Sequence, residues 1–415
     1  MRSPGSQFVR IVTLLAGIVA CSSREQAASQ RVSVTPLASP AGPKSAEPFL
    51  STIDKKTLIL SWLERDVDST SVTLRVATLD SAGEWGEPAD VVRAKDLFVN
   101  WADFPSVVPL ASGKLLAHWL QRNATGRYSY DVRMSESADG GRTWSPSTTA
   151  HTPGIPAEHG FVTLLPRADS TADILFLNGS PAPTDAPGKR GPPMRVAMSR
   201  WTAAGAVAGP EEILDMRACD CCQTAAAVTS RGPVILYRDR TENETRDIYV
   251  RRFVGGAWTD TKPLHADGWI IDACPVNGPA ISASGEQVAA VWFTGARDTA
   301  KVQLVFSRDA GATFGQPVRI DAGMPSGRVD VELLDGGDAL VTWIERMGKD
   351  SAEVRARIVR PDGTTEPALT VSPLSGGRAS GFPRMVRRRD GIVLAWTVPG
   401  ATSQVRLAAL KIAPR

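Results

Sequence analysis

Three of the chain's five cysteines fall within four positions, in the stretch RACDCCQTA. Cys219, Cys221 and Cys222 offer sulfur atoms for disulfide bonds, for coordination of a soft metal ion such as copper or zinc, or for redox exchange. When CCQTAAAV, from Cys221, is aligned with CPVNGPAI, from Cys274, a β-branched residue stands seven positions after each cysteine. The alignment predicts that Cys221 and Cys274 lie at matching positions of neighbouring strands.

Three interpretations of this cluster are open. Two disulfides are the simplest, because four cysteines besides Cys21 make an even number in a chain predicted to be exported. A copper or zinc site on Cys219, Cys221, Cys222 and Cys274 is the second, although the usual pair of C-x-x-C zinc motifs is not present. A redox-active cysteine pair is the third.

The elements that position these residues are short strands in a repeat of about fifty residues. A short apolar strand that ends in an aromatic residue recurs seven times, at Trp62, Trp119, Phe176, Tyr237, Trp292, Trp343 and Trp396. A segment of alternating polarity, typical of another strand, follows each one, as in VTLRVA and YDVRMS. Four-stranded units at this spacing are typical of propeller blades. The sequence therefore predicts an all-β, seven-bladed β-propeller with four-stranded antiparallel blades.

The last repeat, ending in VRLAALKIAPR, contains only three predicted strands. The segment RVSVTPL, Arg31 to Leu37, alternates like a strand and is expected to supply the missing outer strand of the last blade. Such pairing would close the ring and remove an exposed sheet edge. We expect residues 31–415 to form a single propeller domain and the protein to be a monomer.

The turn between the third and fourth strands carries the most specific motif. SADGGRTW, from Ser137, matches the Asp-box pattern S-x-D-x-G-x-T-W, and SRDAGATF, from Ser307, matches it with Phe in place of Trp. Asp139 and Asp309 are expected to be structural, because an aspartate in such a turn accepts backbone N–H bonds. With these motifs and the blade repeat, the chain resembles the exported bacterial Asp-box (BNR-repeat) sialidase-like β-propeller family.

This resemblance implies an action on glycans. Sialidases clamp a substrate carboxylate with three arginines and use a tyrosine nucleophile with a glutamate partner and an aspartate acid/base. The chain contains four tyrosines and no F/Y-R-I-P motif. The resemblance implies a glycan or another acidic small ligand as partner and, if the protein is an enzyme, glycoside hydrolysis of the exo-α-sialidase type. A non-catalytic interaction propeller is the alternative.

Propeller topology predicts where the site lies. The loop leading into the first strand of each blade and the turn between its second and third strands share one face, here called the top face, and the Asp boxes lie on the opposite face. A ligand site is expected on the top face near the central channel. The predicted catalytic residues are Asp103, Glu158, His159 and Asp247; the predicted substrate-binding residues are Trp101, Arg238, Arg246, Trp269, Asn277, Arg328 and Arg384.

Each of these candidates has a structural alternative. Arginines and aspartates of the turn 238–247 can form salt bridges that hold the turn, including Asp239 and Arg240. Asp103 and Glu158 can cap strands or pair with an arginine instead of forming a catalytic carboxylate pair. The tryptophans can pack in the core instead of stacking on sugar rings.

The N-terminal segment predicts export. Arg2 and Arg10 precede or flank the apolar run IVTLLAGIVA, which is too short to span a bilayer but has the length of a signal-peptide core. The run ends in IVAC, which resembles a bacterial lipobox, so residues 1–21 are interpreted as a lipoprotein-type signal peptide, Cys21 as its lipidation site and residues 22–30 as a polar tether. We expect an outer-membrane or periplasmic lipoprotein, or a secreted protein, that contacts membrane only through its lipid. The net charge of +3 gives no indication of nucleic-acid binding.

Overall fold

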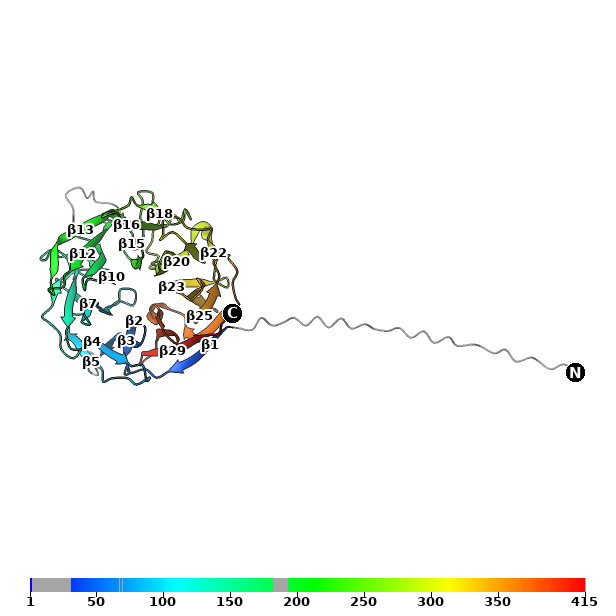
Figure 1. The fold of residues 1–415 in the computed structure, drawn as a ribbon, viewed down its shortest axis with the longest axis horizontal. Coiled ribbons are helices and arrows are strands. Elements are labelled where there is room, and N and C mark those ends of the chain that lie inside the picture. The colour runs from blue at the N-terminus through cyan, green and yellow to red at the C-terminus, as the bar shows by residue number, and fades with distance from the viewer. Residues whose placement is uncertain (2–30, 67, 69, 182–192, 415) are drawn as a thin grey trace.

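Seven antiparallel sheets surround a central axis, as Figure 1 shows in a view along the shortest dimension of the protein. The structure is a computed structural model that describes residues 1, 31–66, 68, 70–181 and 193–414. The predicted signal peptide, the lipidation site Cys21 and the tether 22–30 lie outside the described residues. Within the described part of the chain, none of the helices has the length and apolar character that a membrane crossing requires.

Six of the sheets are built from consecutive strands, and each is one blade. Blade 1 contains β2 (Ser45–Ile53), β3 (Thr57–Arg65), β4 (Val72–Leu79) and β5 (Ala89–Ala94). Blade 2 contains β6 (Ser106–Pro109), β7 (Leu115–Arg122), β8 (Tyr130–Ser137) and β9 (Thr148–Thr149). Blade 3 contains β10 (His159–Pro166), β11 (Ala172–Asn178), β12 (Met194–Trp201) and β13 (Val207–Ala218). Blade 4 contains β14 (Ala225–Thr229), β15 (Gly232–Arg238), β16 (Ile248–Val254), β17 (Ala257–Trp258) and β18 (Lys262–Pro263). Blade 5 contains β19 (Ala280–Ser284), β20 (Gln287–Thr294), β21 (Lys301–Ser307) and β22 (Val318–Arg319). Blade 6 contains β23 (Pro325–Leu333), β24 (Ala339–Arg346), β25 (Ser351–Val359) and β26 (Leu369–Ser375). Two short 3-10 helices, η1 (Ala296–Asp298) and η2 (Arg378–Ser380), lie in top-face loops.

The seventh blade combines the two ends of the domain. It contains β27 (Arg384–Arg388), β28 (Gly391–Val398) and β29 (Gln404–Ile412), with β1 (Val32–Leu37) as its outer strand. β1 runs antiparallel to β29, from Val32 opposite Ile412 to Leu37 opposite Leu407, and the two strands lie side by side in Figure 1. Both the predicted seven-bladed fold and its closure by the N-terminal strand are confirmed.

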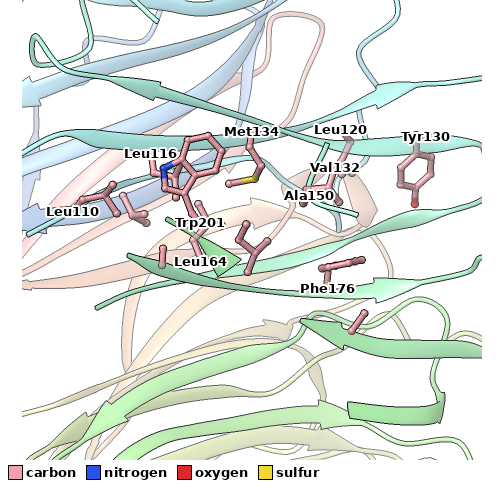
Figure 2. Packing of buried hydrophobic residues seen from close by; sticks show 14 of the residues in the cluster. Leu110, Leu116, Leu120, Tyr130, Val132, Met134, Ala150, Leu164, Phe176 and Trp201 are labelled. Carbon is pink, nitrogen blue, oxygen red and sulfur yellow. The ribbon is translucent and has the colours of Figure 1, made fainter. Parts of the chain in front are cut away.

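The core consists of apolar layers between neighbouring blades. The seven aromatic residues that mark the repeat lie on the second strand of each blade and are at most 5 % exposed. Figure 2 shows one such layer, to which Met134 of blade 2 and Phe176 and Trp201 of blade 3 contribute. Because a blade has two apolar faces and little thickness, it buries them only between two neighbours. The ring is therefore stable as a closed unit.

The Asp boxes lie in the turns β8–β9 and β21–β22. Asp139 accepts the Thr143 backbone N–H at 2.9 Å and its hydroxyl at 2.6 Å, and Asp309 accepts the same two bonds from Thr313 at 2.9 and 2.6 Å. The hydrogen bonds to the Asp139 carboxylate hold its pKa at about 2, below the usual value. These aspartates fix turns on the face opposite the predicted site.

Bulges shape the top ends of three innermost strands. Glu47, Phe161 and Arg328 have φ of 50°, 55° and 55°. Each coincides with a register shift, in the pairs β2–β3, β10–β11 and β23–β24. Bulges of this kind redirect side chains and are frequent next to functional sites. They determine which side chains reach the top face.

We expect Asp309→Ala to lower the free energy of unfolding by about 1–2 kcal/mol, because the Thr313 N–H loses its acceptor and the turn loses its constraint. Urea denaturation of the purified protein measures this change. Arg308→Ala, an exposed position in the same turn, is the matched control and should change the value by less than about 0.5 kcal/mol. Equal effects of the two substitutions would contradict a structural role for the aspartate.

Candidate functional site

The turn between β15 and β16 turns its arginines inward. Arg238 is 1 % exposed and donates to the carbonyl oxygens of Asn277 and Phe293 at 2.8 and 2.7 Å. Arg246 is fully buried and donates to Glu244 at 2.7 Å and to Asp220 at 3.3 Å. Their N–H groups are thus engaged within the protein, and the structure places neither guanidinium where a substrate would meet it.

Neighbouring candidates brace the same loops. Arg240 pairs with Glu244 at 2.9 Å, as the salt-bridge alternative predicts. Asp247 accepts the backbone N–H groups of Gly268 and Trp269, and the Trp269 ring lies 5.0 Å beneath the Arg238 guanidinium. The Asn277 side chain accepts the Arg328 N–H at 2.7 Å. Asp247, Trp269 and Asn277 are buried, and these contacts hold the loops that surround them.

The carboxylates of Asp103 and Glu158 are brought together by Tyr130, a residue that the sequence analysis did not select. The Tyr130 hydroxyl donates to Glu158 at 2.7 Å and lies 3.4 Å from Asp103, whose other oxygen accepts the Phe161 N–H at 2.7 Å. Burial raises the pKa of Asp103 well above its usual value and that of Glu158 to about 7.

Tyrosine, glutamate and aspartate are the residue types of a sialidase centre, but this cluster belongs to the core. Tyr130 is 0 % exposed, and its ring stacks on Phe98 with centroids 3.9 Å apart. Figure 2 shows it at one end of the layer between blades 2 and 3. Because the Tyr130 hydroxyl is buried in this layer, it does not reach a glycosidic carbon. The cluster therefore acts as a polar clasp between two blades.

His159, another predicted catalytic residue, stacks on His151 with ring centroids 3.7 Å apart. Its Nδ1 lies 3.2 Å from the Tyr130 carbonyl and its Nε2 2.9 Å from the Ser180 hydroxyl. Burial and the neighbouring His151 lower the pKa of His159 to about 4, so the ring is neutral at pH 7. His151 is held similarly, by the Thr152 carbonyl at 3.1 Å and the Val132 N–H at 3.3 Å. Both rings have their nitrogens occupied by protein groups.

The central channel holds Arg384. Its Nε lies 3.6 Å from Asp330, and its guanidinium covers Phe49 and Phe104 at 5.4 and 5.5 Å. These residues and Asp103 line a cavity of about 150 Å³. This volume suits a few water molecules rather than a sugar ring.

Arg328 lies at the channel mouth of blade 6. It donates to the Ser380 hydroxyl at 2.6 Å and to the Gly377 carbonyl at 2.9 Å, and its guanidinium covers the Trp101 ring at 4.6 Å. Trp101 is half-buried and also packs on Phe382, with centroids 5.9 Å apart. Arg328 thus fixes the position of Trp101, which stays partly exposed.

The four cysteines meet as the alignment predicted, but all four are free thiols. Cys219 Sγ lies 3.5 Å from Cys222 Sγ and 3.8 Å from Cys221 Sγ, whereas a disulfide requires about 2.05 Å. The predicted disulfides are therefore absent from these four residues. The cluster also lies in the loop between β13 and β14 and not at the start of an innermost strand. Cys219 and Cys222 have C-x-x-C spacing, which is the one sequence signal that pairs these two residues.

Electrostatics at the cluster favour a thiolate at Cys219. Burial alone would raise its pKa, but hydrogen bonds from Cys221 and Cys222 and the charges of Arg246 and Arg238 hold the pKa well below its usual value. Arg246 Nη1 lies 3.2 Å from Cys219 Sγ. Cys274 is exposed, and its thiol interacts with that of Cys221.

A separate top-face groove, which the sequence analysis did not identify, lies where blades 7, 1 and 2 meet. It has a volume of about 490 Å³, and its charged and aromatic lining consists of Lys44, Glu47, Arg65, Trp101 and Arg378. A hydrogen bond from the Arg65 N–H to the Lys44 carbonyl, at 3.1 Å, joins two of its sides. The groove has the volume of a small-molecule site.

Glu47 is the distinctive residue of this groove. The bulge in β2 places it there, 9 % exposed, with its backbone N–H bonded to the Thr397 hydroxyl at 3.2 Å. Burial raises the pKa of Glu47 to about 7 in spite of the opposing charge of Arg65. A carboxyl that is half protonated near neutral pH can donate a proton as well as accept one. The one signal for Glu47 in the sequence is its place at the end of the proline-rich segment SPAGPKSAE, which leads into a predicted strand.

Comparisons with known proteins show similarity of fold. No family model matches the chain, and no curated protein matches it by sequence. A crystal structure of a protein of unknown function from Dyadobacter fermentans is similar over 92 % of this chain and 99 % of its own, with a TM-score of 0.53 and 11 % identity. The polysaccharide lyase Uly1 is similar over 89 % of this chain and 90 % of its own, with a TM-score of 0.52 and 8 % identity. The Hadza microbial sialidase Hz136 is more distant, with a TM-score of 0.46 and 14 % identity over 82 % of this chain and 73 % of its own. The propeller is thus distantly similar in fold to a polysaccharide lyase.

We expect Glu47→Gln to change how stability depends on pH. The folded protein holds the Glu47 proton up to about pH 7, whereas the unfolded chain releases it near pH 4.5. The contribution of Glu47 to the free energy of unfolding of the wild-type protein is therefore fully present below pH 4.5, and it declines by roughly 3 kcal/mol as the pH rises through 7. Urea denaturation at pH 4.5, 6 and 8 measures the free energy of unfolding of both proteins. Between the lowest and the highest pH, the difference between them should shift by that amount in favour of the variant. Exposed Glu87→Gln is the matched control, and a pH-independent difference for Glu47→Gln would contradict the assignment.

Proposed function

We propose that the protein binds acidic saccharides in the groove formed by Lys44, Glu47, Arg65, Trp101 and Arg378. The observation that carries this proposal is a protonatable carboxyl on the floor of a groove lined by three cationic side chains. Up to about pH 7 the carboxyl is largely neutral, so the groove carries net positive charge and attracts an anionic ligand.

The chemistry of the lining matches an acidic sugar. Arg65 and Arg378 are exposed and offer the planar N–H pairs that bind carboxylates and sulfates. The accessible part of Trp101 provides an apolar surface for the less polar face of a sugar ring. A polysaccharide lyase among the proteins of similar fold is in keeping with a saccharide ligand for this chain.

Glu47 gives the site the capacity for catalysis. In its protonated state it can donate to a glycosidic oxygen or to a ligand carboxylate. We propose that the activity is hydrolysis of a glycosidic bond. Glu47 protonates the leaving oxygen, a water molecule forms the new bond to the anomeric carbon, and the proton that this water releases restores the Glu47 acid. This replaces a sialidase mechanism on the buried Tyr130.

Binding of a uronic-acid trisaccharide and of the neutral trisaccharide of the same linkage, measured by calorimetry, tests the proposal. The acidic ligand should bind more tightly, and its affinity should fall with added salt. Arg378→Ala should weaken it about tenfold, which corresponds to about 1.4 kcal/mol. Arg406→Ala, an exposed arginine of β29 outside the groove, is the matched control. Equal affinity for both trisaccharides, or unchanged affinity in Arg65→Ala and Arg378→Ala, would refute the site.

Product analysis after prolonged incubation separates binding from catalysis. Glu47→Gln should retain binding of the trisaccharide and lose its cleavage. If the wild-type protein binds the acidic trisaccharide and releases no product from a panel of acidic glycans, the function is binding alone.

We also propose export and lipid anchoring at Cys21, on the signal-peptide and lipobox pattern of the sequence. Mass spectrometry of the N-terminal peptide from a bacterial membrane fraction should show diacylglycerol attached to Cys21. An unmodified peptide that still carries residues 1–20 would reject this proposal.

A further inference from the structure

Three sulfur atoms gather near a fourth cysteine in the loops that lead into blades 4 and 5. Cys219, Cys221 and Cys222 belong to the loop that leads into β14, and Cys274 belongs to the loop that leads into β19. The first three sulfurs lie within 4.8 Å of one another. Cys274 lies outside this group of three, and its Sγ is 3.9 Å from the carboxylate of Asp220, the residue between Cys219 and Cys221. Cys219 and Cys222 are buried, Cys221 is half-buried and Cys274 is exposed. The cluster is thus enclosed on the protein side and reachable from solvent.

The distances between these sulfurs match those of ligands around one metal ion. A tetrahedral ion with metal–sulfur bonds of about 2.3 Å holds its sulfurs about 3.8 Å apart. The observed separations from Cys219 are 3.5 Å to Cys222 and 3.8 Å to Cys221. A disulfide, by contrast, would bring one pair to about 2.05 Å.

The surrounding charges suit a thiolate cluster. Arg246 Nη1 donates to Cys219 Sγ at 3.2 Å and also contacts Asp220, the residue between Cys219 and Cys221, at 3.3 Å. Arg240 holds the same aspartate at 3.4 Å. These contacts orient the ligand loop, and the buried guanidinium offsets negative charge on the sulfurs. The charge of the buried Arg246 guanidinium is also balanced by Glu244, at 2.7 Å.

A second cluster of candidate ligands, Asp131, His151 and His159, does not have these properties. Its donor atoms lie within 4.8 Å of one another. However, the nitrogens of both histidines are engaged by backbone groups and by Ser180, as described above. Metal binding there would require those bonds to break, whereas the sulfurs need only lose protons.

We propose that Cys219, Cys221, Cys222 and Cys274 coordinate one Zn²⁺ ion, which joins the leading loops of blades 4 and 5. Four sulfurs around one ion favour zinc among the abundant metals that take tetrahedral thiolate sites. The thiols release their protons on binding, and no oxidation or reduction is involved. Such a closed site is structural. It is distinct from the saccharide groove, which lies over blades 7, 1 and 2, and it does not depend on the proposed function.

Metal content and visible spectra of the full chain test this inference. The protein is purified anaerobically with a thiol-free reductant, supplied with Zn²⁺ and passed over a desalting column. Elemental analysis should then find about one zinc per chain. Replacement of zinc by Co²⁺ should give thiolate-to-cobalt absorption and the intense visible bands of a tetrahedral site. Cys219→Ser and Cys222→Ser should lose the metal, and Cys274→Ser should weaken zinc at least tenfold in competition with a chelator.

Two control variants separate the cluster from other ligands. Cys21→Ser removes the remaining cysteine of the chain, and Asp131→Asn alters the histidine cluster; both should retain about one zinc. If a cysteine variant fails to fold, as judged by circular dichroism, X-ray absorption of the wild-type protein decides. It should show a shell of sulfur alone at about 2.3 Å.

Several outcomes would overturn the inference. One is that the protein retains neither zinc nor added Cu⁺ while its four thiols are reduced. A second is that X-ray absorption shows a first shell dominated by nitrogen or oxygen. A third is that zinc persists in Cys219→Ser. Preferential retention of Cu⁺ over Zn²⁺ by the same sulfurs would overturn the assignment to zinc. The inference also predicts a higher melting temperature for the zinc-loaded protein than for the metal-free protein, because the ion binds only the folded arrangement of the loops.

Discussion

The pairing of β1 with β29 is the interaction on which the rest of the structure depends. Each blade buries its two apolar faces only against its neighbours, so an open ring would expose one face at each end. β1 supplies the outer strand of blade 7, and Arg31, next to it, pairs with Asp338 and Glu366 of blade 6 at 3.2 Å each. Closure also brings blade 7 beside blade 1. The groove around Glu47 spans this junction, since Arg378 comes from the loop that leads into blade 7.

Removal of carboxyl groups from water dominates the chemistry of the top face. Glu47, Asp103 and Glu158 all have a raised pKa, and burial is the largest cause for each. The Asp boxes show the opposite effect on the opposite face, where hydrogen bonds from Thr143 lower the pKa of Asp139. Some carboxylates of the ring thus hold turns, whereas other carboxyls keep a proton near neutral pH. Of the second group, Glu47 combines this property with a groove large enough for a sugar.

The sequence predicted the features that arise from local repetition. Seven aromatic positions at a regular spacing marked the blades, and the incomplete last repeat indicated closure by residues 31–37, because strand period and repeat length are local properties. The proximity of Cys221 and Cys274 followed from the same logic, since equivalent positions of adjacent blades are neighbours in space. Their state as free thiols did not follow, because spacing alone does not fix the distance between two sulfurs.

The individual site residues were less predictable. Arg238 and Arg246 occur in a polar turn, yet both are buried, because carbonyl groups and acidic side chains from other loops satisfy their N–H groups. Glu47 carries no motif, and its environment arises from a bulge in β2 and from the contact between blades that lie far apart in sequence. A polar residue type does not reveal whether tertiary contacts will bury its side chain or leave it exposed. For this reason the fold was accessible from sequence, whereas the groove required the structure.

A crystal structure of the protein soaked with a uronic-acid trisaccharide is the most direct test of the central claim, that the groove at the closure of the ring is the functional site. We predict density for the saccharide above Glu47, with a ligand carboxylate within hydrogen-bond distance of Arg65 or Arg378. A saccharide bound at the turn 238–247 or in another top-face loop, with the groove at Glu47 empty, would contradict the account.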